Sequence, residues 1–493
     1  YLGGTGFDTG YVIEVDSAHI YVAGSTWSND FPSAEGKLQG EKDAFLAVLS
    51  LDGSQLISSN LYGGVDQDEA FAMAVEAGTV YLAGDTWSPT FEGALTHGAQ
   101  DAFVLKVGAD GRPAYTLLFG GSDEEDARSL AARGGVAFLT GSTQSADFPA
   151  KGYAGNREAY VTRVDQGGKL TAGIFIGGEG EDWGESLALG PDGKLYVGGT
   201  TGSATLPGTS QASGSLDGFA AQIDPGLNQV NWIRRLGGSG ADETHGITTG
   251  AEGQVLIVGS SGSADFPITG TVTGFRKGSL EDAFLVRLDT NGETNLSTRI
   301  GGQGNDQAYL IRSTGENSLA MTGSTQSKDF PLPANSTGKN LAGSQDAFIL
   351  LASLPPAPIP QSTSTEPSPA TETPLAIEPT TPPPLDTAEP AGEATSTPAV
   401  SATGGEITLS TTQPAGISGQ ASGATLSSTP LVANSPSAPT EPAATAMGIL
   451  SAAASNPESG AMASQGSPSP LIWIVPLLVL LGGGGWLLYR KRS

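Results

Sequence analysis

The sequence contains no cysteine and only three histidines among its 493 residues. The absence of cysteine excludes disulfides, thiol nucleophiles and cysteine metal ligands. The histidines are His19, His97 and His245, and none of them belongs to a motif with the spacing of a metal site or a catalytic triad. Catalysis therefore has few residues on which to depend.

Basic residues are also scarce, with 23 Lys and Arg against 51 Asp and Glu, and the formal net charge is −28 at pH 7. A nucleic-acid partner needs a basic surface, so this composition excludes that class of partner. The glycine pairs described below lie between strand-like segments rather than before a helix, which excludes nucleotide-binding phosphate loops. Residues 1–354 show no sustained helical periodicity, so this part is predicted to be all-β.

Glycine is abundant, with 71 residues, and six glycine pairs recur at a nearly fixed interval. The first glycines of successive pairs are 60, 57, 57, 60 and 64 residues apart. A period of this size indicates a repeat architecture, in which each repeat is one supersecondary unit that cannot bury its apolar surface alone. The pairs are Gly3-Gly4, Gly63-Gly64, Gly120-Gly121, Gly177-Gly178, Gly237-Gly238 and Gly301-Gly302.

Each repeat predicts four short strands, which the second repeat shows at residues 70–75, 80–85, 102–107 and 114–119. These segments are runs of β-branched, aromatic and small apolar residues bounded by Gly, Asp, Asn and Pro. Four strands per repeat favour the blade of a β-propeller over a sandwich, because a sandwich has no reason to repeat its sequence every four strands. The expected fold is an all-β propeller with six visible four-stranded blades over residues 1–354.

The sixth repeat has three strand-like segments, at residues 308–312, 318–324 and 347–351, before Leu354-Pro355-Pro356 interrupts the pattern. The chain opens with Tyr1-Leu2-Gly3-Gly4, which corresponds to the end of a fourth strand. We therefore expect an N-terminal strand to complete the sixth blade and close the ring. Further blades encoded upstream of Tyr1 are the alternative, because the chain does not start with Met.

Several strings recur from repeat to repeat with small changes, as in Leu61-Tyr62-Gly63-Gly64, residues 20–26 (IYVAGST), Asp30-Phe31-Pro32, and residues 43–49 (DAFLAVL) followed by Asp52-Gly53. Together they resemble the SBBP β-propeller repeat of bacterial and archaeal surface proteins, over about residues 1–354. The resemblance implies an extracytoplasmic propeller and no family-wide catalytic residues. The name of that family implies seven blades, whereas six repeats are visible here.

Acidic residues recur at fixed places in the predicted loops and strand starts. Two loop positions are expected at the same end of the propeller, so one face would be ringed with carboxylates. Asp in such loops closes them by accepting backbone hydrogen bonds, and calcium binding is the alternative, since hard oxygen ligands in Gly-rich loops suit that ion. The first position is Asp8, Asp68, Glu125, Asp182, Asp242 and Asp306, the second is Asp30, Asp147, Asp265 and Asp329, and a third set opening strands, interpreted as framework, is Asp43, Asp101, Glu158, Asp217, Asp282 and Asp346.

Residues that break the repeat are the better candidates for ligand binding. Trp27 and Trp87 occupy equivalent places in two repeats, and Trp183 directly follows Asp182. Aromatic faces beside carboxylates suit the recognition of sugars, whereas packing between blades is the alternative role for the tryptophans. His245, with Asp242 and Glu243 before it, is the weak candidate for acid–base catalysis, and a solvated loop histidine is the alternative.

Residues 355–470 are dominated by Pro, Ser, Thr, Ala and Gly and contain no Lys or Arg, which predicts a disordered stalk. Leu471 to Tyr489 form an uncharged apolar run of roughly 28 Å as a helix, at about 1.5 Å per residue, which suffices to span a hydrocarbon core. Residues 490–493 form a basic tail that predicts a cytoplasmic C-terminus. A processed sorting tail is the alternative, although no LPxTG motif precedes the apolar run.

The sequence thus predicts a single-pass protein of the cell membrane, with its propeller on the extracytoplasmic side. Its predicted role is to bind an extracellular glycan or protein, as an adhesion or envelope-display module, through Trp183, Asp182, Asp242 and His245 above all. One alternative is an extracellular hydrolase or lyase that uses the acidic loop face. The other is a purely structural surface-layer component. No cofactor is predicted apart from the calcium alternative.

Protease treatment of intact cells tests the predicted topology. The stalk is expected to be cut while the propeller resists, so a soluble fragment close to residues 1–354 should be released into the medium, as detected by mass spectrometry. Recovery of this fragment only after cell lysis would contradict the predicted orientation.

Overall fold

The computed structural model of the chain describes residues 1–32, 37–152, 155–209, 214–250, 252–270, 280–332, 336, 341 and 343–356. The predicted membrane segment, the basic tail and all but the first two residues of the predicted stalk lie outside these ranges. The described ranges contain β-strands, turns and loops and no helix. No helix that could cross a membrane is therefore found among them.

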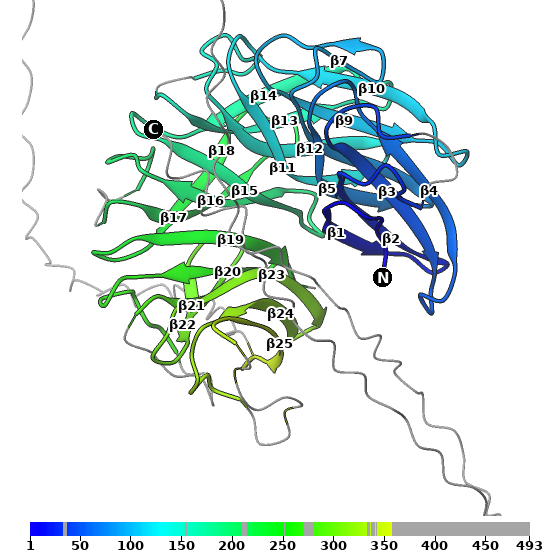
Figure 1. The fold of residues 1–493 in the computed structure, drawn as a ribbon. Coiled ribbons are helices and arrows are strands. Elements are labelled where there is room, and N and C mark those ends of the chain that lie inside the picture. The colour runs from blue at the N-terminus through cyan, green and yellow to red at the C-terminus, as the bar shows by residue number, and fades with distance from the viewer. Residues whose placement is uncertain are drawn as a thin grey trace, which may run out of the picture. The chain divides into compact units, whose positions relative to one another are not determined.

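The strands form six antiparallel sheets that follow one another along the chain (Figure 1). The first comprises β1 (Asp8–Val15), β2 (His19–Thr26), β3 (Asp43–Ser50) and β4 (Leu56–Tyr62), and the second β5 (Asp68–Glu76), β6 (Thr79–Thr86), β9 (Asp101–Val107) and β10 (Pro113–Phe119). The third comprises β11 (Glu125–Arg133), β12 (Val136–Thr143), β13 (Glu158–Val164) and β14 (Leu170–Ile176), and the fourth β15 (Asp182–Leu189), β16 (Leu195–Thr201), β17 (Asp217–Ile223) and β18 (Val230–Leu236). The fifth comprises β19 (Asp242–Thr249), β20 (Val255–Ser261), β21 (Asp282–Leu288) and β22 (Thr294–Ile300), and the sixth β23 (Asp306–Gly315), β24 (Ser318–Thr325) and β25 (Asp346–Ser353). A small hairpin of β7 (Thr90–Phe91) and β8 (Ala94–Leu95) is added to the second repeat.

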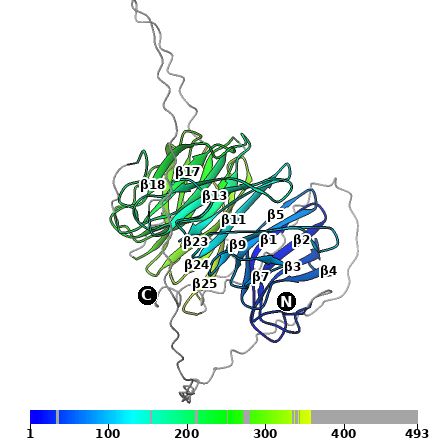
Figure 2. The same cartoon turned by 90° about the horizontal axis from the view of Figure 1, so that it is seen from above.

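These sheets are the six blades of a β-propeller, as the repeats predict. The first strand of each blade contacts the first strand of the next, from β1 to β5 and onward to β23, and the succession can be followed by colour in Figure 2. Arg312 of β23 pairs with Glu14 of β1 at 3.1 Å, so the last inner strand returns to the first. Both side chains are partly exposed, and an exposed pair of this kind contributes about 0–1 kcal/mol.

Apolar layers between successive blades form the core. One layer joins Leu46 of the first blade to Leu82 and Leu105 of the second, and another joins Phe119 of the second to Phe148 of the third, with ring centres 6.3 Å apart. Because the two central strands of a blade are covered on both faces, they read as nearly continuous apolar runs rather than alternating ones. This explains why the third strand of each repeat, such as DAFVLKV in β9, is so uniform.

The expectation that an N-terminal strand completes the sixth blade is wrong for this structure. The sixth sheet has three strands, and Tyr1-Leu2-Gly3-Gly4 does not pair with β25. Gly4 and Thr5 instead donate their backbone N–H groups to Asp8 and Asp30 of the first blade, at 2.8 Å each.

The acidic residue that opens each inner strand is a hydrogen-bond acceptor that ties the blade together, and it is buried in every blade but the first. Asp68 accepts hydrogen bonds from the backbone N–H of Gly64 at 2.8 Å, from Ser88 Oγ at 3.0 Å and from Thr86 Oγ1. Asp8, Glu125, Asp182, Asp242 and Asp306 likewise accept from the second glycine of the preceding pair. These bonds support the loop-closing interpretation of this position.

Every inner strand also carries a β-bulge at the same place. In β5, Ala70 pairs with Gly84 and Ala72 with Ala83, so Phe71 is the extra residue. Equivalent register shifts occur in β1, β11, β15, β19 and β23. The glycine opposite the bulge is required by close approach, because a Cβ on Gly84 would overlap the carbonyl oxygen of Glu69.

Substitution of this glycine tests the constraint. Gly84→Ala is expected to lower the free energy of unfolding by about 3 kcal/mol, because the added methyl group collides with backbone that cannot move independently of the sheet. Gly10→Ala is the control, since the nearest atom to its added Cβ is 3.5 Å away. Equal stability of the two variants in chemical denaturation would show that the bulge does not depend on the glycine.

Candidate functional site

The six bulged residues form the candidate site. A bulge leaves one residue unpaired and redirects its side chain, and bulges are over-represented next to functional sites. The framework around each bulge is nearly constant, but the bulged residue itself changes from blade to blade. The set, called the bulge ring here, is Tyr11, Phe71, Arg128, Glu185, His245 and Tyr309.

Members of the bulge ring from neighbouring blades touch one another. The rings of Tyr11 and Phe71 have centres 5.0 Å apart, and the Arg128 guanidinium lies 4.6 Å from the Phe71 ring centre. Burial disfavours the charge on Arg128, but the carboxylates of Asp126 and Glu185 raise its pKa above the usual range. On the other side, the rings of His245 and Tyr309 are 5.6 Å apart. The bulge ring thus contains two groups of residues in contact, one of Tyr11, Phe71 and Arg128 and one of His245 and Tyr309.

A cluster of polar and aromatic residues extends the ring at the first two blades. Glu69 lies two residues before Phe71, and its carboxylate is 2.5 Å from Lys42 Nζ and accepts a hydrogen bond from the Tyr11 hydroxyl at 3.1 Å. Lys42 Nζ also lies 5.4 Å from the ring centre of Trp27, which is 42% exposed. Burial and the charge of Glu69 raise the pKa of Tyr11 to about 12. An exposed indole beside a paired acid and base can stack on a sugar or an apolar side chain while its neighbours bind hydroxyl groups.

Asp85 departs from the repeat in the same region. The other blades have Ser or Thr at this place, and Asp85 is directly opposite Glu69 in the strand pair. Its side chain is 3% exposed, accepts a hydrogen bond from Gln100, and has one oxygen, Oδ1, with no hydrogen-bond partner. Burial, followed by the charge of Glu69, raises the pKa of Asp85 well above its ordinary value. A buried carboxyl group with a raised pKa therefore lies beside the Glu69 carboxyl group.

The sequence-predicted candidates are distributed between this surface and the framework. His245 belongs to the bulge ring, where its Nε2 lies 3.4 Å from Ser260 Oγ, and Trp183 lies two residues before Glu185 on the same strand. Trp27 lies in the Lys42–Glu69 cluster, and Trp87 is exposed, with its backbone N–H bonded to Gln67. Asp182 and Asp242 are 0% exposed and belong to the framework, so a ligand in solvent does not reach them.

The calcium candidates Asp8, Asp68, Asp182, Asp242 and Asp306 each lie in a different blade. Within the described ranges, no three acidic or histidine side chains come together as a metal-binding group. The exposed carboxylates of the loop face are instead the Asp-Phe-Pro residues Asp30, Asp147, Asp265 and Asp329. Each of them accepts a backbone hydrogen bond from the preceding glycine-rich loop.

Sequence reasoning did not identify Tyr11, Phe71, Arg128, Glu185 and Tyr309, nor the pair Lys42 and Glu69. The signal that could have found the bulged residues is the isolated glycine inside the second strand of every repeat, as in the GST and GDT strings. A glycine inside a strand pattern suggests a bulge or a close backbone approach. Its partner strand therefore marks the place where side chains are redirected.

The raised pKa of Asp85 predicts a pH dependence of stability. The folded protein holds this proton more tightly than the unfolded chain, so the carboxyl group costs stability as pH rises above about 4. Asp85→Asn should therefore gain at least about 1 kcal/mol of unfolding free energy relative to the parent between pH 4.5 and pH 8, in urea titrations.

Asp52→Asn is the matched control, because hydrogen bonds from Ser50 and Ser54 lower the pKa of Asp52 to about 2. Its carboxyl group is ionised in both the folded and the unfolded protein above about pH 4.5, so the stability difference between this variant and the parent should stay constant from pH 4.5 to pH 8. A parallel response of the two variants would contradict the assignment of a raised pKa to Asp85.

No protein-family model matches the chain. Regulatory protein FlaEY of Caulobacter vibrioides is 25% identical over 270 residues, which cover 49% of this chain and 28% of that protein. The chain thus spans less than a third of this curated relative's length.

The solved structures that resemble the chain share little sequence identity with it. Virginiamycin B lyase from Staphylococcus aureus has a TM-score of 0.31 and 12% identity, covering 64% of this chain and 77% of that one. YCF48 bound to D1 peptide has a TM-score of 0.30 and 11% identity, covering 66% and 81%. The WD40 β-propeller domain of Doa1 has a TM-score of 0.30 and 8% identity, covering 66% and 92%. The description of this chain as a β-propeller rests on its own strand order and pairing.

Proposed function

We propose that the protein is a membrane-anchored, cell-surface binding module that recognises a glycan or a protein through the bulge ring and the adjoining Lys42–Glu69 cluster. The observation that carries the proposal is that the residues around each bulge are nearly constant, whereas the bulged residue itself varies from blade to blade. Six blades keep the same glycine, acidic and hydroxyl residues around each bulge, yet they place six side chains there of which only Tyr occurs twice. Constant support under variable side chains is how rigid scaffolds present recognition residues.

The chemistry of the surface suits a polar ligand with some apolar faces. Tyr11, Phe71 and Trp27 offer rings, while Arg128, Lys42 and Glu69 offer donors and acceptors. Lys42 is paired with Glu69, and Arg128 is paired with Asp126. Because these charged groups are paired before a ligand arrives, less side-chain ordering is required on binding. A carbohydrate, or a protein loop with hydroxyl and apolar groups, matches this arrangement.

The proposed address follows from the sequence outside the described ranges. The apolar run from Leu471 to Tyr489 and the basic residues after it support a single-pass anchor with a cytoplasmic C-terminus. The resemblance of the repeats to SBBP repeats supports an extracytoplasmic propeller. The Caulobacter relative is named a regulatory protein, a role that a binding module can also serve.

An extracellular hydrolase or lyase is the second candidate, and Asp85 beside Glu69 is the observation that favours it. A buried carboxyl group with a raised pKa next to a second carboxyl group is the arrangement of a general acid with its partner. The 3% exposure of Asp85 favours binding over catalysis, because a substrate would first have to displace the residues that cover it.

Glycan-array binding by the purified full chain tests the proposal. The double variant Phe71→Ala, Arg128→Ala should lose at least tenfold in affinity for any glycan bound by the parent, since removal of aromatic and Arg anchors commonly costs more than about 1.4 kcal/mol. Ser54→Ala, in an exposed hairpin turn of the first blade, should bind as the parent does. Undiminished binding by the double variant would place recognition elsewhere, and release of sugars that depends on Asp85 would favour the hydrolase.

A further inference from the structure

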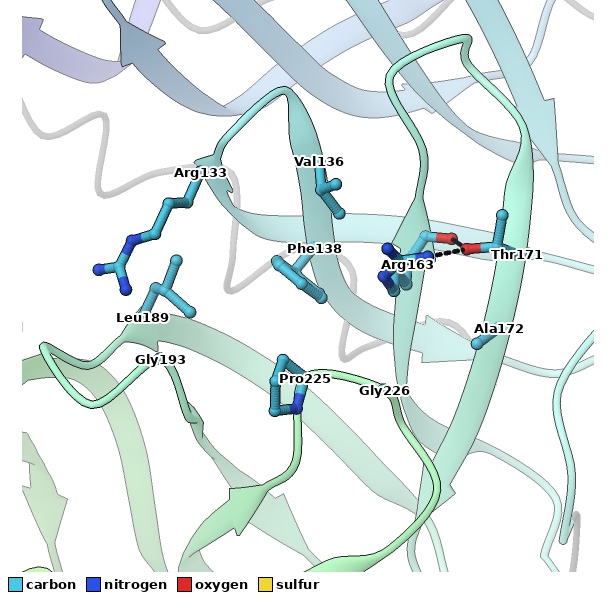
Figure 3. Close-up of a pocket in the computed structure, with 10 residues that line it drawn as sticks. All are labelled: Arg133, Val136, Phe138, Arg163, Thr171, Ala172, Leu189, Gly193, Pro225 and Gly226. Carbon is cyan, nitrogen blue, oxygen red and sulfur yellow. Dashed lines mark hydrogen bonds between the residues drawn. The ribbon is translucent and has the colours of Figure 1, made fainter.

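A cavity of about 450 Å³ lies between the third and fourth blades, at the end of the blades that carries the hairpin turns. Its residues come from both blades, with Arg133, Phe138 and Arg163 from the third and Leu189 and Pro225 from the fourth. Figure 3 shows Arg133 and Arg163 on either side of Phe138, with Pro225 across from that ring. The cavity is remote in sequence and in blade position from the Lys42–Glu69 cluster.

The cavity lies where the residue sizes at the interface between the third and fourth blades differ from those at two other interfaces. In the second blade, Tyr115 packs on Gly168 in the turn of the next blade, and a Cβ on that glycine would lie 2.6 Å from the tyrosine ring. In the fourth blade, Trp232 packs on Gly292 in the same way, at 2.8 Å. Each aromatic residue lies five positions before the next glycine pair, and in the third blade that position is Ala172.

At this interface a leucine of the fourth blade fills only part of the volume that an aromatic ring would occupy. The turn of the fourth blade places Leu227 at the position of Gly168 and Gly292, with a φ of 54°, and this leucine packs into the core between the third and fourth blades. A leucine side chain does not replace a tyrosine or tryptophan ring. The remaining space borders Ala172 and forms the cavity. The site therefore lies about where the interface of the second and third blades and that of the fourth and fifth blades hold a flat aromatic ring.

The lining has an apolar floor and two cationic sides. Val136, Phe138 and Leu189 supply the floor, and the ten lining residues include two arginines and no carboxylate. Arg133 Nη1 donates to the carbonyl oxygen of Gly190 at 3.0 Å, and Arg163 Nη1 donates to Thr171 Oγ1 at 2.8 Å. Each guanidinium has five N–H donors, so these anchoring bonds fix its position and leave further donors for a ligand.

We propose that this cavity binds a small aromatic carboxylate. The ring of the ligand would take the place that Tyr115 and Trp232 occupy in the other interfaces, against Phe138 and Leu189. Its carboxylate would accept hydrogen bonds from Arg133 or Arg163, whose planar fork matches a carboxylate in two-point fashion. In a chain with a net charge of −28, a pocket lined by arginine alone among charged residues selects for an anion.

Calorimetric titration of the full chain in detergent with indole-3-acetate, whose ring matches that of Trp232, tests the proposal. Saturable binding with a Kd on the order of 100 µM is expected for a ligand of this size. Indole-3-acetamide, which keeps the ring and lacks the charge, should bind at least tenfold more weakly. A detergent-only titration corrects for partitioning into micelles.

Two variants and a control assign the binding to the cavity. Ala172→Trp restores the aromatic residue of the neighbouring interfaces, so it should abolish binding while the melting temperature stays equal or rises. Arg163→Gln should weaken indole-3-acetate at least tenfold and leave indole-3-acetamide unchanged, which decides the question if Ala172→Trp does not fold. Arg112→Gln, in an exposed turn of the second blade, carries the same change in charge and should bind as the parent does.

Three results would overturn the proposal. The first is no saturable binding by the parent. The second is equal affinity for the acid and the amide. The third is undiminished binding by a folded Ala172→Trp variant or by Arg163→Gln. None of these outcomes bears on the bulge ring, because the two sites share no residue.

Discussion

The close approach between a glycine of each second strand and the backbone of the inner strand is the constraint on which the site depends. Gly84 cannot carry a side chain without overlapping the Glu69 carbonyl oxygen, and the equivalent glycines meet the same obstacle. This approach accommodates a bulge, and the bulge frees one residue per blade from strand pairing. Buried acidic residues such as Asp68 then fasten the adjoining loops. The repeat therefore holds a constant frame around one variable position.

Two interfaces between blades follow a second rule, in which a large residue on one blade is matched by a small one on the next. Tyr115 with Gly168 and Trp232 with Gly292 obey it, and both interfaces are filled by the aromatic ring. The third interface reverses the sizes, with Ala172 and Leu227, and the exchange leaves a cavity beside two arginines.

Periodicity explains why much of the fold could be predicted from the sequence. The strands expected at residues 70–75 and 80–85 are β5 (Asp68–Glu76) and β6 (Thr79–Thr86), because glycines and acidic residues fix their ends in every repeat. The pairing of the N-terminal residues with the last blade was predicted wrongly, since among the described residues Tyr1-Leu2 does not join the sheet of β23, β24 and β25. Of the site, His245, Trp183 and Trp27 could be singled out as breaks in the repeat. Phe71 and Arg128 could not, because a bulge is a mismatch between two strands and leaves only a glycine as its trace in the sequence.

Simultaneous replacement of the six bulged residues by alanine tests the central claim most directly, with thermal unfolding and glycan-array binding measured on the same full-length sample. If these residues are displayed by the frame rather than part of it, the cooperative unfolding transition should be kept while ligand binding is lost. Loss of the folded state, or binding that survives in the folded variant, would contradict the claim that the bulged residues bind the ligand and are not required for folding.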